Sequence, residues 1–177
     1  WRGTLSNVTP ISQMLAEEKI RHRICSPSSL AMAVSKIKGL TDIEANTVWK
    51  KLITLCYDLN INAYGSWPKA IYAASTFGVL GGIEAHADLE SAEKCLELGQ
   101  PVVCSIDYAK GKLRGAPLAS TKGHLVTLIG IEDEQILVMD PAAPEKSSIA
   151  REYDRKEFED AWLRNRGAGY YFCVTSE

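Results

Sequence analysis

Apolar residues recur at helical spacing along the first half of the chain. In the stretch that follows Cys25, the apolar positions Leu30, Val34 and Ile37 fall on one face, and Gly39 is a suitable stop. The same reasoning predicts three more helices, over 41–55, 66–77 and 88–98. The first twelve residues contain β-branched residues and a proline, so we expect an extended arm there, followed by a polar loop.

The pattern changes after Pro101, where β-branched and other apolar residues form short continuous runs. Four of these runs are expected to be strands: 102–106, 125–131, 136–140 and 170–174. The middle two are separated by a short polar turn, so they should form an antiparallel hairpin. A further helix should begin after Asp154 and end at Gly167. Because helices come first and strands later, we predict an α+β fold with helices on one side of an antiparallel sheet.

Composition limits the class of protein and its partners. The 177 residues contain no internal repeat or linker, so we expect a single domain over 1–177. Lys and Arg number 20 against 22 Asp and Glu, which leaves no cationic surface for nucleic acid. No apolar run approaches the roughly 20 residues of a membrane span, so no membrane insertion is expected. The cysteines are scattered and the chain has only three histidines, so we expect no metal site.

A thiol is the best candidate for covalent chemistry. The chain has no phosphate-binding glycine motif and no G-x-S-x-G serine motif. Cys25 lies at the predicted helix start, where unpaired N–H groups and the helix dipole can lower a thiol pKa from about 8.5 to roughly 3.5–7.5. A structural role for Cys25 stays open from its position alone. The other cysteines fall inside helix or strand patterns and are expected to be small core residues: Cys56, Cys95, Cys104 and Cys173.

The predicted hairpin brings two further polar residues together. His124 begins its first strand and Asp140 ends its second, so both lie at the open end, nearly opposite one another. A carboxylate beside an imidazole is the orienting arrangement of a catalytic triad. The alternative is that Asp140 only opens a turn with Pro141 and that His124 only begins a strand. The remaining histidines, His22 and His86, lack this support and are expected at the surface.

Six sequence blocks, in this order, resemble bacterial stand-alone cysteine peptidases related to the bacteriocin-processing, double-glycine leader peptidase family. The blocks are CSPSSLAMAV, YGSWPKAIYAAS, LELGQPVVCSI, LRGAPLASTKGHLVTLIG, ILVMDPAAP and REYDRKEFEDAWL, and they span essentially the whole chain. The resemblance implies a papain-like fold, with N-terminal helices packed on an antiparallel sheet. It also implies a triad in which Cys25 is the nucleophile, His124 the base and Asp140 the orienting carboxylate.

The family also carries a glutamine upstream of the cysteine in a proline-x-x-glutamine context, which here is Pro10 to Gln13. Under this resemblance, the amide of Gln13 and the backbone N–H of Cys25 donate to the oxyanion of the tetrahedral intermediate. Losing one such donor typically costs about 3 kcal/mol of transition-state stabilisation. The alternative is that Gln13 is a solvated loop residue. No cofactor is implied.

Two loops are candidates for the wall of a substrate cleft. Tyr64, Gly65 and Trp67 precede a predicted helix, and Gly123 ends a segment rich in Gly, Lys and Pro that leads into the base. Aromatic residues in such places also serve simply as packing groups, so this alternative stays open.

The expected function is hydrolysis of peptide bonds in a peptide or protein substrate, through a thioester acyl-enzyme, by a monomeric protein. Two alternatives stay open: an acyl or peptidyl transferase or amidase with the same triad, and a catalytically silent peptide-binding domain. Ser26 stands where many relatives have glycine, and Lys69 where many have an aromatic residue, so the substrate preference is not predicted. The resemblance implies an extracytoplasmic setting, secreted or periplasmic, in a bacterium.

Overall fold

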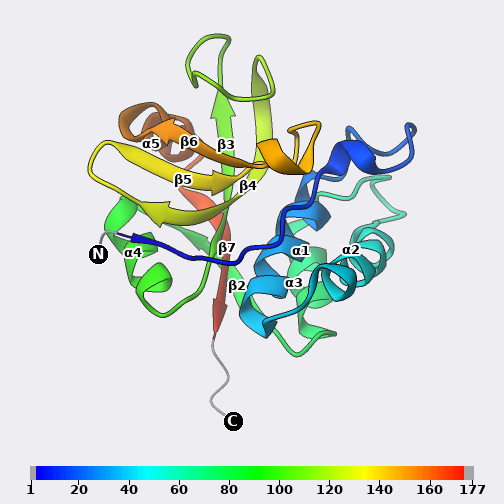
Figure 1. The fold of residues 1–177 in the computed structure, drawn as a ribbon. Helices are drawn as coiled ribbons and strands as arrows, with labels where there is room; N and C mark the ends of the chain where they lie inside the picture. The colour runs from blue at the N-terminus through cyan, green and yellow to red at the C-terminus, as the bar shows by residue number, and fades with distance from the viewer. Residues whose placement is uncertain (1–2, 174–177) are drawn as a thin grey trace.

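An antiparallel sheet forms the centre of the structure, a computed structural model that describes residues 3–173 (Figure 1). Within the described residues the sheet has seven strands in the order β2-β7-β3-β4-β5-β6, and β1 pairs with β4. The strands are β1 (Gly3–Thr4), β2 (Leu80–Ala85), β3 (Val102–Tyr108), β4 (Thr121–Ile131), β5 (Gln135–Met139), β6 (Ala150–Asp154) and β7 (Ala168–Cys173). The predicted hairpin of β4 and β5 is confirmed, as is the α+β class.

The helices begin and end close to the predicted positions. They are α1 (Cys25–Lys38), α2 (Asp42–Cys56), α3 (Trp67–Ser75), α4 (Leu89–Glu97) and α5 (Arg155–Arg164), with short 3₁₀ turns η1 (Gln13–Leu15) and η2 (Lys146–Ser148). Gly39 ends α1 in the left-handed conformation, at φ 62°. Thr41 and Glu44 form a reciprocal capping box at the start of α2. These local signals explain why the helix boundaries could be predicted.

The helices cover both faces of the sheet, which corrects the expectation that they lie on one side. Alternate residues of β4 point to opposite faces, so Leu125 packs with α1–α3 while Val126 packs with α4 and α5. Figure 1 shows α1, α2 and α3 together on one side of the strands and α4 and α5 on the other. The N-terminal helices therefore pack on the sheet as predicted, but a second apolar core lies behind it.

Three strands were not predicted: β1 is only two residues long, and the sequences of β2 and β6 carry no strand pattern. In β2, a Cβ atom on Gly81 would lie 2.3 Å from the carbonyl oxygen of Tyr171, so glycine is required by the close approach of β7. The sequence of β6, AREYD, is mostly polar because β6 is an edge strand that pairs only with β5. Val174, the last residue of the predicted final strand, lies outside the described residues.

Side-chain hydrogen bonds fix α1 to the sheet. The buried hydroxyl of Ser29 donates to the carbonyl oxygen of Leu125 at 2.8 Å, and the hydroxyl of Thr127 donates to the carbonyl oxygen of Ser29 at 2.8 Å. One turn earlier, the hydroxyls of Ser26 and Tyr170 are 2.9 Å apart. Because these contacts lie along the first half of α1, they set how the start of that helix meets the middle of β4 and β7.

The cysteines other than Cys25 are not all core residues. Cys56 and Cys104 are buried and Cys95 is partly buried, as expected. Cys173 is exposed at the end of β7, so its assignment to the core is wrong. All of them are free thiols within the part of the chain that the structure describes.

Candidate active site

Cys25 is the first residue of α1 and interacts directly with an imidazole from the sheet. Burial by itself raises the pKa of this thiol. The hydrogen bond from His124 and its positive charge lower the pKa, and so do the backbone N–H groups of Leu125 and Ser26. The lowering contributions prevail, so the pKa of Cys25 lies below its ordinary value. The site therefore favours a thiolate.

His124 and Asp140 form a buried ion pair. Nε2 of His124 lies 2.8 Å from Oδ1 of Asp140, and both side chains are almost inaccessible to solvent. Burial alone would lower the pKa of His124, but the charge and hydrogen bond of Asp140, together with the Cys25 thiol, raise it to about 10. Burial would raise the pKa of Asp140, but His124 and other donors bring it below its ordinary value. The raised pKa favours the imidazolium form of His124, which lies between the carboxylate of Asp140 and the thiol of Cys25.

The register of the hairpin differs in detail from the prediction. A bulge at Ile129 adds one residue to β4, and Thr127 pairs with Met139. The same register places Asp140 across from Val126, which is two residues from His124 on the same face of the sheet. The two side chains thus meet diagonally rather than directly opposite one another.

The ring nitrogens of His124 have separate partners. Because Nε2 donates to Asp140, Nδ1 is the nitrogen that is left for the thiol of Cys25. The three residues therefore form a continuous chain from thiol to imidazole to carboxylate. This order is the one required of a nucleophile, a base and an orienting group.

Asp140 has two further hydrogen-bond donors, one of which the sequence did not reveal. The backbone N–H of Ala142 donates to Oδ1 at 3.0 Å, and the hydroxyl of Tyr153 donates to Oδ2 at 2.7 Å. Tyr153 lies on β6, is 1% exposed and stacks on Phe158, with ring centroids 6.3 Å apart. The sequence offers little to identify it beyond an aromatic residue directly before the helix cap.

Gln13 is buried at 5% exposure, which excludes the alternative that it is a solvated loop residue. Its backbone N–H donates to the carbonyl oxygen of Pro141 at 2.9 Å, directly after Asp140. Its side-chain Nε2 donates to the carbonyl oxygen of Arg21 at 2.6 Å, while Oε1 has no hydrogen-bond partner. The second N–H of this amide is not used by Arg21, so it can serve another acceptor.

The residues predicted to wall a cleft lie at the starts of α3 and β4. Tyr64 is partly buried, 5.0 Å from Tyr57 between ring centroids, and the guanidinium of Arg23 lies 5.4 Å from its ring centroid. Trp67 begins α3 and packs partly against the helical core.

The two glycines of the same prediction, Gly65 and Gly123, are exposed, and Gly123 directly precedes His124. Arg23 connects Tyr64 to the chain two residues before Cys25. Substrate contact by these four residues stays a prediction.

The two remaining histidines differ from one another. His22 is exposed, as expected, but the expectation that His86 lies at the surface is wrong. His86 is 3% exposed, its Nδ1 lies 2.5 Å from the hydroxyl of Ser91, and its ring lies 5.0 Å from that of Trp162. It therefore helps to attach α4 to the second core, and its burial lowers its pKa.

Other classes of site find no support in the described residues. No group of three or more His, Cys, Asp or Glu side chains between residues 3 and 173 is placed to hold a metal ion. In that same range, every helix is too short or too polar to cross a membrane.

Comparisons with known proteins agree with this geometry. Residues 5–170 match the Peptidase C39 like family. Three crystal structures have a similar fold. A protein described as a C39-like peptidase from Bacillus anthracis is 20% identical with a TM-score of 0.71, and the alignment covers 100% of both chains. A double glycine motif protease from an AMS/PCAT transporter, in complex with the leader peptide, is 18% identical with a TM-score of 0.65, covering 98% of this chain and 96% of that one.

The third structure is the peptidase domain of Streptococcus ComA, a bifunctional ABC transporter in a quorum-sensing pathway. It is 15% identical with a TM-score of 0.58, covering 96% of this chain and 100% of that one. No curated protein matches the chain. At these identities the structures show the fold, whereas the family match covers most of the sequence. The chain belongs to the Peptidase C39 like family of peptidases.

Proposed function

We propose that the protein is a cysteine peptidase that hydrolyses peptide bonds through a thioester intermediate. The observation that carries the proposal is the series of contacts from the partly buried Cys25 through the buried His124 to the buried Asp140, with the thiol at a helix start. The family match supports peptidase chemistry in general. The lowered pKa of Cys25 and the raised pKa of His124 support a thiolate and imidazolium pair before substrate arrives.

In the first half-reaction, the thiolate of Cys25 attacks the carbonyl carbon, and the carbonyl electrons move onto oxygen. The imidazolium of His124 then gives its Nδ1 proton to the leaving nitrogen, the C–N bond breaks, and a thioester and a free amine result. In the second half-reaction, His124 accepts a proton from water, which attacks the thioester. Breaking of the C–S bond releases the acid and restores the thiolate.

We further propose that Gln13 and the backbone N–H of Cys25 donate to the oxyanion. Two observations support this role for Gln13: its side chain is buried, and its amide keeps one N–H that Arg21 does not use. Its backbone contact to Pro141 attaches it to the loop that follows Asp140. Replacement of Gln13 by alanine should lower kcat by about 10²–10³-fold.

The test is a multiplexed peptide cleavage profile of the wild type beside Cys25→Ala. Cys95→Ala is a matched control, because Cys95 is also a free thiol but its pKa is raised by burial. We expect cleavage by the wild type and by Cys95→Ala, and none by Cys25→Ala. Cleavage that survives Cys25→Ala contradicts the proposal. Products that carry an added amine in place of a free acid would instead show that the enzyme transfers its acyl group.

A further inference from the structure

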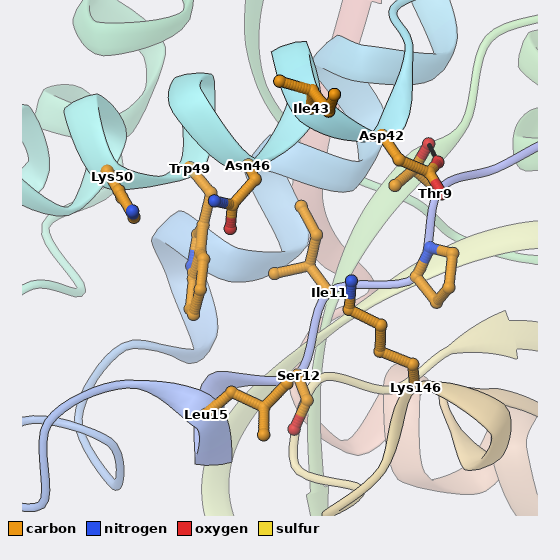
Figure 2. Close-up of a pocket in the computed structure, with 11 residues that line it drawn as sticks. Thr9, Ile11, Ser12, Leu15, Asp42, Ile43, Asn46, Trp49, Lys50 and Lys146 are labelled. Carbon is orange, nitrogen blue, oxygen red and sulfur yellow. Dashed lines mark hydrogen bonds between the residues drawn. The ribbon is translucent and has the colours of Figure 1, made fainter.

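Ser12 lies directly before Gln13, in extended backbone at φ -96° and ψ 121°. Because successive side chains of an extended segment point to opposite sides, Ile11 and Ser12 face different parts of the fold. Figure 2 shows Ile11 pointing toward α2 and Ser12 pointing away from it. Ser12 is 1% exposed, so its hydroxyl lies in the interior and needs hydrogen-bond partners there.

Two hydrogen bonds satisfy this hydroxyl. It donates to the carbonyl oxygen of Ala143 at 2.5 Å, and it accepts the backbone N–H of Met14 at 3.2 Å. The first bond joins segments that are 131 residues apart in the chain. The second caps the 3₁₀ turn η1, of which Gln13 is the first residue. The hydroxyl of Ser12 therefore connects the turn that carries Gln13 to the loop after β5.

The loop after β5 begins with the carboxylate that contacts His124. Within this loop, the backbone N–H of Ala142 donates to Oδ1 of Asp140 at 3.0 Å. The backbone N–H of Ala143 donates to the carbonyl oxygen of Asp140 at 3.3 Å. Asp140 and Ala143 are both at 0% exposure. Because the loop closes on Asp140, a contact to Ala143 places a group relative to the proposed triad.

Two hydrogen bonds attach the segment of Gln13 to this loop. The backbone N–H of Gln13 donates to the carbonyl oxygen of Pro141 at 2.9 Å, and the hydroxyl of Ser12 donates to that of Ala143. One bond alone would let the segment rotate about it, whereas two bonds at separate points fix its orientation. An oxyanion donor must be held within about 0.5 Å of its productive position. The bond from Ser12 is the one that a side-chain substitution can remove.

We infer that Ser12 is a positioning residue that holds the amide of Gln13 where it donates to the oxyanion, an inference that rests on the proposed function. The single O–H of Ser12 is used by Ala143, so Ser12 cannot itself donate to the oxyanion. Its loss should therefore slow the steps in which negative charge develops on the carbonyl oxygen. The reactivity of the Cys25 thiolate should stay unchanged.

Two reagents that react with the same thiol distinguish these effects. With p-nitrophenyl acetate, the thiolate attacks the ester carbonyl, an oxyanion forms, and the C–O bond breaks to give an acetyl thioester and p-nitrophenolate. With iodoacetamide, the thiolate displaces iodide from a methylene carbon and no oxyanion forms. Release of p-nitrophenolate, less that from the Cys25→Ala protein, gives the acylation rate, and peptide mapping of Cys25 gives the alkylation rate. The ratio of acylation to alkylation therefore measures the oxyanion donors.

The decisive comparison is a double-mutant cycle on this ratio. Gln13→Ala should lower it by about 10²–10³-fold, because one oxyanion donor is lost. Ser12→Ala keeps that donor but misplaces it, so the ratio should fall by about tenfold while the alkylation rate stays within about twofold of the wild type. Combined with Gln13→Ala, Ser12→Ala should lower the ratio by less than about twofold more, because the group through which Ser12 acts is already absent. Additive losses overturn the inference.

Two further variants separate the hydroxyl from the stability of the turn and of the protein. Ser12→Gly removes the same hydroxyl, but glycine is a suitable N-cap residue, so η1 is retained and the ratio should fall as in Ser12→Ala. The matched control is Ser91→Ala on α4, in the second core. The hydroxyl of Ser91 also has two partners, the carbonyl oxygen of Asp88 at 3.2 Å and Nδ1 of His86 at 2.5 Å. Its removal should leave the ratio unchanged.

Three results would overturn the positioning role. The first is a wild-type ratio in both Ser12 variants, and the second is an equal fall in Ser91→Ala. The third is alkylation by iodoacetamide that slows as much as acylation, because Ser12 would then act on the thiolate through Asp140 and His124 rather than through Gln13.

The same assay separates this inference from the peptidase proposal, because acylation by an ester does not require cleavage of a peptide. If the wild type is acylated but cleaves no peptide, a lowered ratio in Ser12→Ala supports the positioning role while the peptidase proposal fails. If the wild type cleaves peptides and Ser12→Ala keeps its ratio, the positioning role alone is overturned. Absence of acylation at Cys25 overturns both.

Discussion

Replacing Tyr153 with phenylalanine removes one hydroxyl group and leaves Oδ2 of Asp140 without its donor. Oδ1 keeps its hydrogen bonds to His124 and Ala142, so the carboxylate loses only one of its donors. A hydrogen bond to a charged group contributes about 1.5–3 kcal/mol, and we take about 2 kcal/mol for this one. At this chain length, each 1 kcal/mol changes Tm by about 2–4 °C, so Tm should fall by about 4–8 °C.

The same change should weaken the thiolate of Cys25. Without the Tyr153 hydroxyl, one contact fewer holds the carboxylate of Asp140 in position against His124, and the imidazolium of His124 is what lowers the pKa of the thiol. The pKa of Cys25 therefore rises toward its ordinary value. At pH values below the pKa of Cys25, iodoacetamide should alkylate Cys25 about three- to tenfold more slowly in Tyr153→Phe than in the wild type. Peptide mapping over a range of pH measures this rate.

The control is Tyr108→Phe, because Tyr108 is also a buried phenol, at 2% exposure. Its hydroxyl donates to the main-chain oxygen of Leu118 at 3.1 Å instead of to Asp140. We expect a loss of about 1 kcal/mol and an unchanged alkylation profile. If Tyr153→Phe lowers Tm but leaves the pH profile of Cys25 unchanged, Tyr153 is a packing residue only and the reasoning is refuted.

Three further predictions test the charge, the buried imidazole and the helix cap. Asp140→Asn keeps the shape of the site but removes the charge that raises the pKa of His124, so kcat should fall on the order of 10³–10⁴-fold while circular dichroism stays native. The pKa of His86 is lowered by burial despite two nearby carboxylates, so the unfolded chain binds this proton more readily and stability is lost as pH falls below about 6.5. His86→Phe should make denaturant unfolding less dependent on pH between 7 and 5, and an identical slope would contradict this account. Thr41→Ala should cost about 1 kcal/mol and the mid-helix control Thr47→Ala clearly less, and equal losses would show that the capping box is not the cause.

Much of the fold could be predicted because its signals are local. The ends of α1 and α2 depend on Gly39 and Thr41, whose roles are determined within one turn of the helix. The hairpin was predictable from two apolar runs and a short turn. Because the start of a helix and the open end of a hairpin could be located, Cys25, His124 and Asp140 could be selected before their contacts were known.

The features of the fold and the site that could not be predicted depend on contacts between distant segments of the chain. The sequence around Gly81 suggests a loop. Glycine is needed there because β7 approaches closely, and that contact cannot be seen in the sequence. Tyr153 lies on an edge strand whose polar pattern resembles a loop, so its contact to Asp140 could not be foreseen. His86 was placed at the surface because its neighbours are polar, whereas packing against Trp162 buries it.

The exposed thiol of Cys173 has a consequence for handling the protein. A free, accessible cysteine at the end of β7 can oxidise with the same residue of another molecule, while the buried Cys56 and Cys104 are protected. Preparations kept in air should therefore accumulate disulfide-linked dimers. A reducing agent should separate these dimers, and Cys173→Ser should not form them. Any mass measured in solution reflects the native protein only when that thiol is kept reduced or replaced.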